Sequence, residues 1–241
     1  MEASLNEMFL SSDIIDDALG SIGMRGNPVA KRSAKAVMRN LKHVITREQV
    51  ILSSFMKHFP LDTQKKIQEG KIQLEAFALT VRAQLTATNG NRQLILGPDS
   101  DSKRVVGVKN IEGNELDQYE NLVVTKVRVA HATHASETNP AALVYSNSGT
   151  TVPATIRNGK IDVRLNENRK YEEELALFFN HGGQFAANPG YFDVQTLKTP
   201  FVIQEEHSIE IAITTPPSLT LTNNHFVEVM LMGMRTTRKK V

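Results

Sequence analysis

The feature that most constrains this chain is an alternation of apolar and polar residues that begins after Gly70 and recurs as far as Gly233. Its longest run spans Leu122 to Ala132. A period of two residues places alternate side chains on opposite faces, so each run predicts a strand with one buried face. The other predicted strands are 77–85, 93–96, 104–108, 142–145, 152–156, 161–165, 191–197, 201–203, 208–214 and 225–233. We therefore expect a mainly β chain that forms an antiparallel β-sandwich of jelly-roll-like type.

Turn residues indicate where these strands reverse. Asn89-Gly90 predicts a tight hairpin because both residues tolerate positive φ. The stretch Leu197 to Thr214 predicts a strand, a tight connection and a returning strand. Its polar residues Glu205, Glu206 and His207 are interpreted as that connection rather than as an acid/base cluster.

A helical segment is predicted before the sheets. Asn27-Pro28 is a suitable helix start, and later helices are expected from Thr46 to about His58 and from Asp62 to Ile67, ended by Gly70. The first helix is amphipathic. Its basic stripe contains Lys31, Arg32, Lys35, Arg39 and Lys42, and its apolar stripe contains Val37, Met38, Leu41, Val44 and Ile45. The expected organisation is a basic helical arm or subdomain (1–70), a β-sandwich (71–234) and a basic tail (235–241).

The small net charge of +2 conceals basic ends around an acidic body. Residues 18–47 contain seven Lys or Arg and no acid, and residues 235–241 contain four more. The basic stripe predicts contact with an anionic partner or nucleic acid, and a solvated helix face is the alternative. The apolar stripe predicts a contact with a neighbouring subunit in preference to a membrane surface.

Composition excludes several kinds of chemistry. The chain has no cysteine, which excludes disulfides, thiolate metal ligands and cysteine nucleophiles. Its first 17 residues carry five acids and do not resemble a secretory signal, and the sequence has no run of about 18 apolar residues. Neither a nucleophile-elbow pattern nor a phosphate-binding loop occurs. We expect a cytoplasmically made protein that is not an enzyme and has no cofactor.

Four groups of residues contain side chains of the kinds that form catalytic or metal-binding sites. His131 and His134 have a spacing that zinc can use, but a third ligand is not identifiable. Asp99 and Asp101 lack the rest of a calcium loop, and Glu172 to Glu174 are adjacent residues that point in different directions. His181-Gly182-Gly183 resembles an oxyanion-hole turn without its nucleophile. We therefore predict no catalytic and no metal-binding residues.

Three passages carry a resemblance to a known group of proteins. Glu120 to Val129, Thr199 to Ile203 and Ser208 to Ile211 resemble strand-turn-strand passages of jelly-roll virion proteins from bacteriophages. The resemblance rests mainly on residues 121–233, about half of the chain. It implies a capsid-type, particle-forming structural protein without a cofactor or catalytic residues.

The expected function is therefore that of a self-assembling component of a viral particle, made in the host cytoplasm and located in the virion. Its expected partners are copies of itself, other virion proteins and, through the basic stripe, nucleic acid. Two alternatives remain. One is an adhesin-like binding module that uses the loops 97–103 and 181–191. The other is a hydrolase or isomerase that uses His131, His134 or His181.

Overall fold

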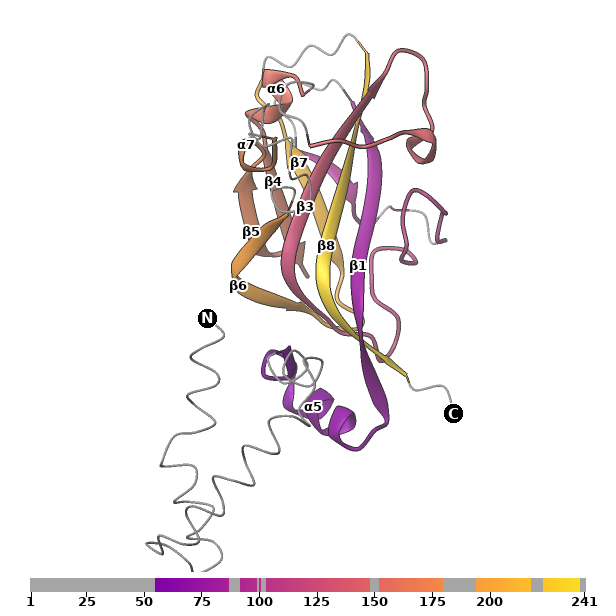
Figure 1. Cartoon of the computed structure of the whole chain (residues 1–241), viewed down its shortest axis with the longest axis vertical. Coiled ribbons are helices and arrows are strands. Elements are labelled where there is room, and N and C mark those ends of the chain that lie inside the picture. Colours follow the sequence, from indigo (N-terminus) through magenta and orange to yellow (C-terminus); the bar gives the residue numbers. More distant parts are fainter. Residues whose placement is uncertain are drawn as a thin grey trace, which may run out of the picture. The chain divides into compact units, whose positions relative to one another are not determined.

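The computed structural model describes residues 55–86, 92–98, 100, 103–147, 152–179, 194–217 and 223–238. The strands in these ranges form two four-stranded antiparallel sheets. Sheet A has the order β1-β8-β3-β6, and sheet B has the order β2-β7-β4-β5 (Figure 1). The prediction of a mainly β, antiparallel sandwich is confirmed.

The strands of sheet A are much longer than those of sheet B. Sheet A contains β1 (Ile72–Leu85), β8 (Asn224–Arg238), β3 (Leu122–His134) and β6 (Gln195–Ile203). Sheet B contains β2 (Arg92–Leu96), β7 (Ile209–Thr214), β4 (Lys160–Leu165) and β5 (Asn168–Glu174). The helices are α5 (Leu61–Gln68), α6 (Ala154–Arg157) and α7 (Ala176–Phe179), with a short 3₁₀ turn η1 (Pro140–Ala142).

Successive strands change sheet at every connection except one. The exception is the hairpin between β4 and β5, whose two-residue loop is Asn166-Glu167. Both residues have positive φ, 48° and 67°, which matches the twist that a two-residue antiparallel turn requires. All other connections pass from one layer of the sandwich to the other.

The inner faces of the two sheets form one continuous apolar core. Alternating residues such as Val127 and Val129 of β3 face residues such as Ile161 and Val163 of β4, as the period of two predicts. Phe178 and Phe179 of α7 belong to the same core and are almost completely buried. The space between the sheets is therefore filled by side chains.

The stretch Leu197 to Thr214 differs from its prediction. Its two strands do not pair with each other, because β6 pairs with β3 in sheet A while β7 pairs with β2 and β4 in sheet B. The intervening residues turn the chain from one sheet to the other, and Glu206 adopts a φ of 62° there. Alternation determines which face of a strand is buried, but the same alternation fits either layer.

Other local predictions fail for similar reasons. β1 and β2, which flank Asn89-Gly90, lie in different sheets and are not a paired hairpin; the turn itself is outside the described residues. Residues 152–156 contain the helix α6, which starts after Pro153, instead of a strand. Residue 142 is the last residue of the turn η1 and residues 143–145 form no strand, whereas 104–108 form a loop with a bridge from Val105 to Lys109.

β1 and β8 pair continuously from Leu85↔His225 to Ile72↔Arg238, and beyond the last pair of β3 with β8, Leu122↔Arg235, they continue as a short two-stranded ribbon. The first residues of the predicted tail, which was expected from residue 235, belong to β8, because this strand continues to Arg238. Arg235 stacks on the ring of Phe77, 3.8 Å from its centroid, and pairs with Glu75 and Glu120. The helix predicted to end at Gly70 is confirmed as α5.

Candidate functional site

The outer face of sheet A carries a buried ion cluster. Glu228 of β8 lies directly opposite Arg82 of β1, whose guanidinium is 2.7 Å from the Glu228 carboxylate. The other carboxylate oxygen accepts a hydrogen bond from Arg128 of β3. Only 3% of the Glu228 side chain is exposed. Because a buried carboxylate is costly without compensation, the two arginines are required partners.

The same arginines hold two loops on this face. Arg82 Nη1 donates a 2.9 Å hydrogen bond to the carbonyl of Gly107, and its guanidinium lies 4.9 Å from the ring centre of Tyr145. Arg128 Nη2 donates to Asn147 Oδ1 at 3.1 Å. Burial raises the pKa of Tyr145 to about 12, so its hydroxyl remains a donor, here to the carbonyl of Pro140. The cluster therefore fixes the loops that precede β3 and follow it.

These two loops touch each other and present apolar side chains. A Cβ on Gly107 would lie 2.7 Å from the Cβ of Ala141, so the loops meet at that point. Val106 is 96% exposed and Val144 is 91% exposed, and Val105 is also exposed. These exposed valines form an apolar surface on fixed loops that another molecule can contact.

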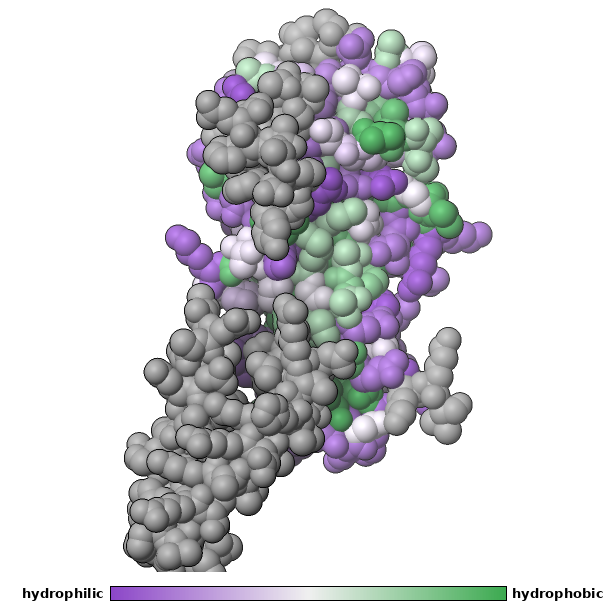
Figure 2. Space-filling model, in the orientation of Figure 1, coloured by the Kyte–Doolittle hydropathy of each residue, from purple (hydrophilic) through white to green (hydrophobic). Residues whose placement is uncertain are grey.

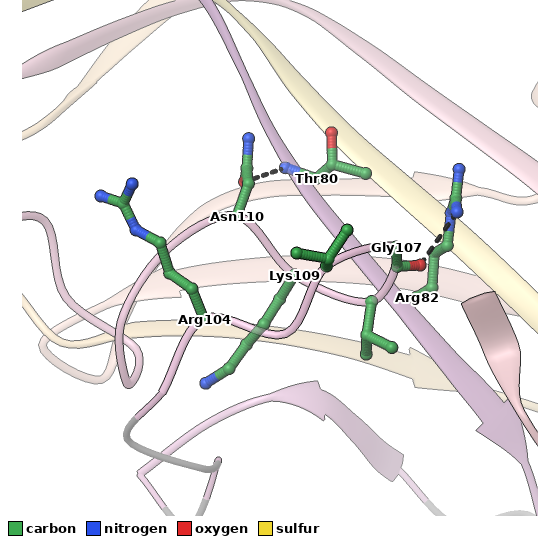
Figure 3. A pocket seen from close by; sticks show the side chains of 8 residues that line it. Thr80, Arg82, Arg104, Gly107, Lys109 and Asn110 are labelled. Carbon is green, nitrogen blue, oxygen red and sulfur yellow. Dashed lines mark hydrogen bonds between the residues drawn. The ribbon is translucent and has the colours of Figure 1, made fainter.

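A pocket of about 350 Å³ lies between β1 and the loop 104–110 (Figure 3). Although three basic residues line it, Figure 3 shows their charged ends pointing in different directions. Arg104 reaches Asp117 at 3.3 Å, and Lys109 Nζ donates to the Gly113 carbonyl at 3.0 Å. These contacts stabilise the loop, and the basic groups do not converge on one point as an anion site would require.

Two histidines form a buried pair on the inner face of sheet A. His131 Nε2 and His225 Nδ1 are 2.9 Å apart, the rings are stacked with centroids separated by 5.2 Å, and Phe179 contacts His131 edge-on. Burial, with a smaller contribution from His225, lowers the pKa of His131 from 6.5 to about 4. Burial also lowers the pKa of His225. Both rings are therefore neutral near pH 7. One ring donates its N–H to the unprotonated nitrogen of the other ring.

This pair predicts a loss of stability in acid. Below pH 6.5 the unfolded chain binds a proton at residue 131 that the folded protein does not bind until about pH 4. The free energy of unfolding should therefore fall by about 3 kcal/mol across that interval. Urea denaturation at several pH values measures the loss, and His131→Leu should remove that part of the pH dependence. An equally steep decline in the variant would contradict the assignment.

The other sites considered in the sequence do not come together. His134 is exposed at the end of β3, where its Nδ1 accepts hydrogen bonds from the backbone of Ser136 and Glu137, and it does not join His131. Glu172 forms ion pairs with Arg169 and Lys160 on the exposed edge strand β5. Among the described residues, no group of three His, Asp or Glu side chains is placed to hold a metal ion.

Several predicted residues fall outside the described part of the chain. These are Asp99, Asp101, the segment 181–183 and both stripes of the predicted first helix, namely Lys31, Arg32, Lys35, Arg39, Lys42, Val37, Met38, Leu41, Val44 and Ile45. None of the helices in the described ranges has the length and apolar character needed to span a membrane. Sequence reasoning missed Glu228 and His225, although a lone acid within the apolar run Phe226 to Met230 was a usable signal.

No protein-family model matches this chain, and no curated protein sequence matches it. Among solved structures, a chain from the "Acidic stable capsid structure of Helicobacter pylori bacteriophage KHP30" matches over 70% of this chain and 99% of its own length. The two are 7% identical in sequence, and the TM-score is 0.26.

Proposed function

We propose that this chain is a structural protein of a viral particle that assembles with copies of itself. The observation that carries the proposal is the strand order, β1-β8-β3-β6 facing β2-β7-β4-β5. Eight strands that alternate between two sheets in this order have the connectivity of a jelly roll, an architecture shared by viral capsid and lectin domains and by cupins. The earlier resemblance to virion proteins of bacteriophages agrees with this connectivity.

Two further features favour a shell component over a protein with an internal ligand. The space between the sheets is occupied by the apolar core, including Phe178 and Phe179, as a rigid building block requires. In addition, α5 and the end of β8 leave the sandwich at the same end, because Ile72 pairs with Arg238 (Figure 1). The basic residues between 18 and 47 and after Arg238 are proposed to contact nucleic acid or a neighbouring subunit. The proposed function includes no enzymatic activity.

The assembly is tested directly. The purified full chain should form closed or ringed particles of uniform size above a threshold concentration, detected by multi-angle light scattering and negative-stain microscopy. A protein that remains monomeric over a wide range of concentration and salt would contradict the proposal.

A full-length variant tests whether the basic stripe binds nucleic acid. Replacing Lys31, Arg32, Lys35, Arg39 and Lys42 by Gln should leave the sandwich folded but weaken nucleic-acid binding. The slope of log affinity against log salt should fall by about four, since each phosphate contact contributes about 0.7–0.9. An unchanged slope would assign the stripe to a protein contact instead.

A binding module is the second candidate, and the exposed side chains of Val106 and Val144 favour it. In that case their replacement by Ser would abolish ligand or receptor binding without altering self-assembly.

A further inference from the structure

The strand β5 lies at one edge of sheet B and carries its charges in two separate blocks. Its sequence is Asn-Arg-Lys-Tyr-Glu-Glu-Glu, so the basic residues Arg169 and Lys170 precede the three acids at 172–174. Five of these seven residues are exposed, and the other two are partly buried. Figure 2 shows hydrophilic side chains at the rim of the sandwich on the side where Figure 1 labels β5. The edge therefore presents both signs of charge to its surroundings, one at each end of the strand.

Some of these charges are not neutralised within the chain. Elsewhere in sheet B the charges are paired, since Asp162 on the outer face binds two arginines. On β5 itself, Glu172 has basic partners in its own chain, as described above. In contrast, Lys170, Glu173 and Glu174 form no ion pair with any residue in the described part of the chain. These three charges are available to a partner.

The backbone of β5 favours a contact between side chains over the addition of a strand. The register of β5 against β4 shifts between Val163 and Arg164, and Lys170 is the extra residue that has no partner on β4. Such a bulge interrupts the regular row of backbone groups that strand addition requires. In addition, the N–H of Glu174 already donates to Oε1 of Glu173 at 3.2 Å. A neighbour would therefore engage the charged side chains of this edge.

The order of the charges restricts what can lie along β5. Nucleic acid or an anionic membrane would be repelled by the acidic half, and a uniformly basic partner would be repelled by Arg169 and Lys170. A fitting partner carries the same two blocks in the reverse order. An antiparallel copy of β5 meets this condition, whereas a parallel copy would place like charges side by side.

We infer that two copies of this chain contact each other through their β5 edges, aligned antiparallel around a two-fold axis near Tyr171. This inference rests on the proposed self-assembly and names one of its contacts. The alignment brings the basic residues 169 and 170 of each copy beside the acidic residues 173 and 174 of the other. The same patch serves both copies, as an isologous contact requires. Exposed charge pairs select orientation more than they add affinity, so the contact should be weak between two copies and cumulative in a particle.

The test reverses only charges that have no ion-pair partner in the described part of the chain. Lys170→Glu makes the edge predominantly acidic, and Glu173→Lys/Glu174→Lys makes it predominantly basic. In each full-length variant the dissociation constant of self-association should rise about tenfold or more, because every reversed contact occurs twice across the axis. An equimolar mixture of the two variants should restore the wild-type value, since each edge then meets its complement. Analytical ultracentrifugation at low ionic strength, where screening is weakest, measures both quantities.

The matched control is Lys170→Arg, which keeps the charge and should associate as the wild type does. Melting temperatures equal to that of the wild type, measured by circular dichroism, would show that all variants fold. Unchanged self-association of both charge-reversed variants would overturn the contact. So would a mixture that associates no better than its components.

Zero-length cross-linking with a carbodiimide identifies the residues that meet. This reagent joins an amine to a carboxylate that lies in direct contact with it. Peptide mapping of the wild-type dimer should find Lys170 joined to Glu173 or Glu174 of another copy, and mixing isotope-labelled with unlabelled chains distinguishes this link from one within a chain. Lys170→Arg lacks the amine and should lose the link while it still associates. A wild-type dimer without this link would place the contact elsewhere and refute the inference.

These outcomes separate the contact from the function. Particles that form equally well from the wild type and from Lys170→Glu would refute the edge contact and leave the proposed assembly intact. Dimers that obey the charge exchange but never enlarge into particles would support the edge contact and contradict the viral-shell proposal.

Discussion

Glu228→Ala should lower the free energy of unfolding by about 3–5 kcal/mol. The substitution removes the one carboxylate that lies between Arg82 and Arg128, and both guanidinium groups are then left partly buried without that compensation. It also releases the contacts through which those arginines hold Gly107 and Asn147. Urea denaturation monitored by circular dichroism measures the loss.

The control for this substitution is Glu172→Ala. Glu172 also pairs with two basic residues, Arg169 of β5 and Lys160 of β4, but the side chains of all three are partly exposed at the edge of sheet B. Exposed pairs contribute about 0–1 kcal/mol, so the control should be nearly neutral. Similar losses in the two variants would show that the buried cluster has no special role in stability.

Gly233→Ala should be at least as damaging, with an expected loss of about 4 kcal/mol or complete failure to fold. A Cβ at this position would lie 1.7 Å from the carbonyl oxygen of Val123 and 3.3 Å from the Cα of Val124. Because these are backbone atoms of β3, no side-chain rotation relieves the clash. The close approach occurs where the register of β3 against β8 shifts beside Val124.

Gly97→Ala is the matched control. The atoms nearest to its added Cβ belong to the side chain of Leu94, at 3.1 Å, and that side chain can move. The change should alter the free energy of unfolding by less than about 1 kcal/mol. A soluble Gly233→Ala protein with wild-type stability in urea would show that the two strands can separate without cost.

Sequence patterns predicted individual strands better than their partners. The alternation in β3, β4 and β7 correctly identified their buried faces because burial follows the pleat of a single strand. It could not distinguish sheet A from sheet B, so the strands on either side of Asn89-Gly90 and of Glu206 were predicted to be hairpins. Which layer a strand joins depends on contacts between residues that are far apart in the sequence.

Sequence patterns likewise did not predict which side chains come together in the ion cluster. Arg82, Arg128 and Glu228 each interrupt an apolar strand, which is visible in the sequence. Their association is not visible, because Arg82 and Glu228 are 146 residues apart and become neighbours only when β1 pairs with β8. The likeness to virion proteins pointed to an assembly function without indicating any of these residues.

The pairing of Ile72 with Arg238 marks the boundary between two parts of the chain that differ in charge. Residues 1–71 and 239–241 together contain 13 of the 28 lysine and arginine residues and eight of the 26 acids. The remainder of the protein carries an excess of acids. The small net charge of +2 is therefore the difference between a basic share outside the paired strands and an acidic share within them, so added salt should weaken attraction as well as repulsion between copies of the chain.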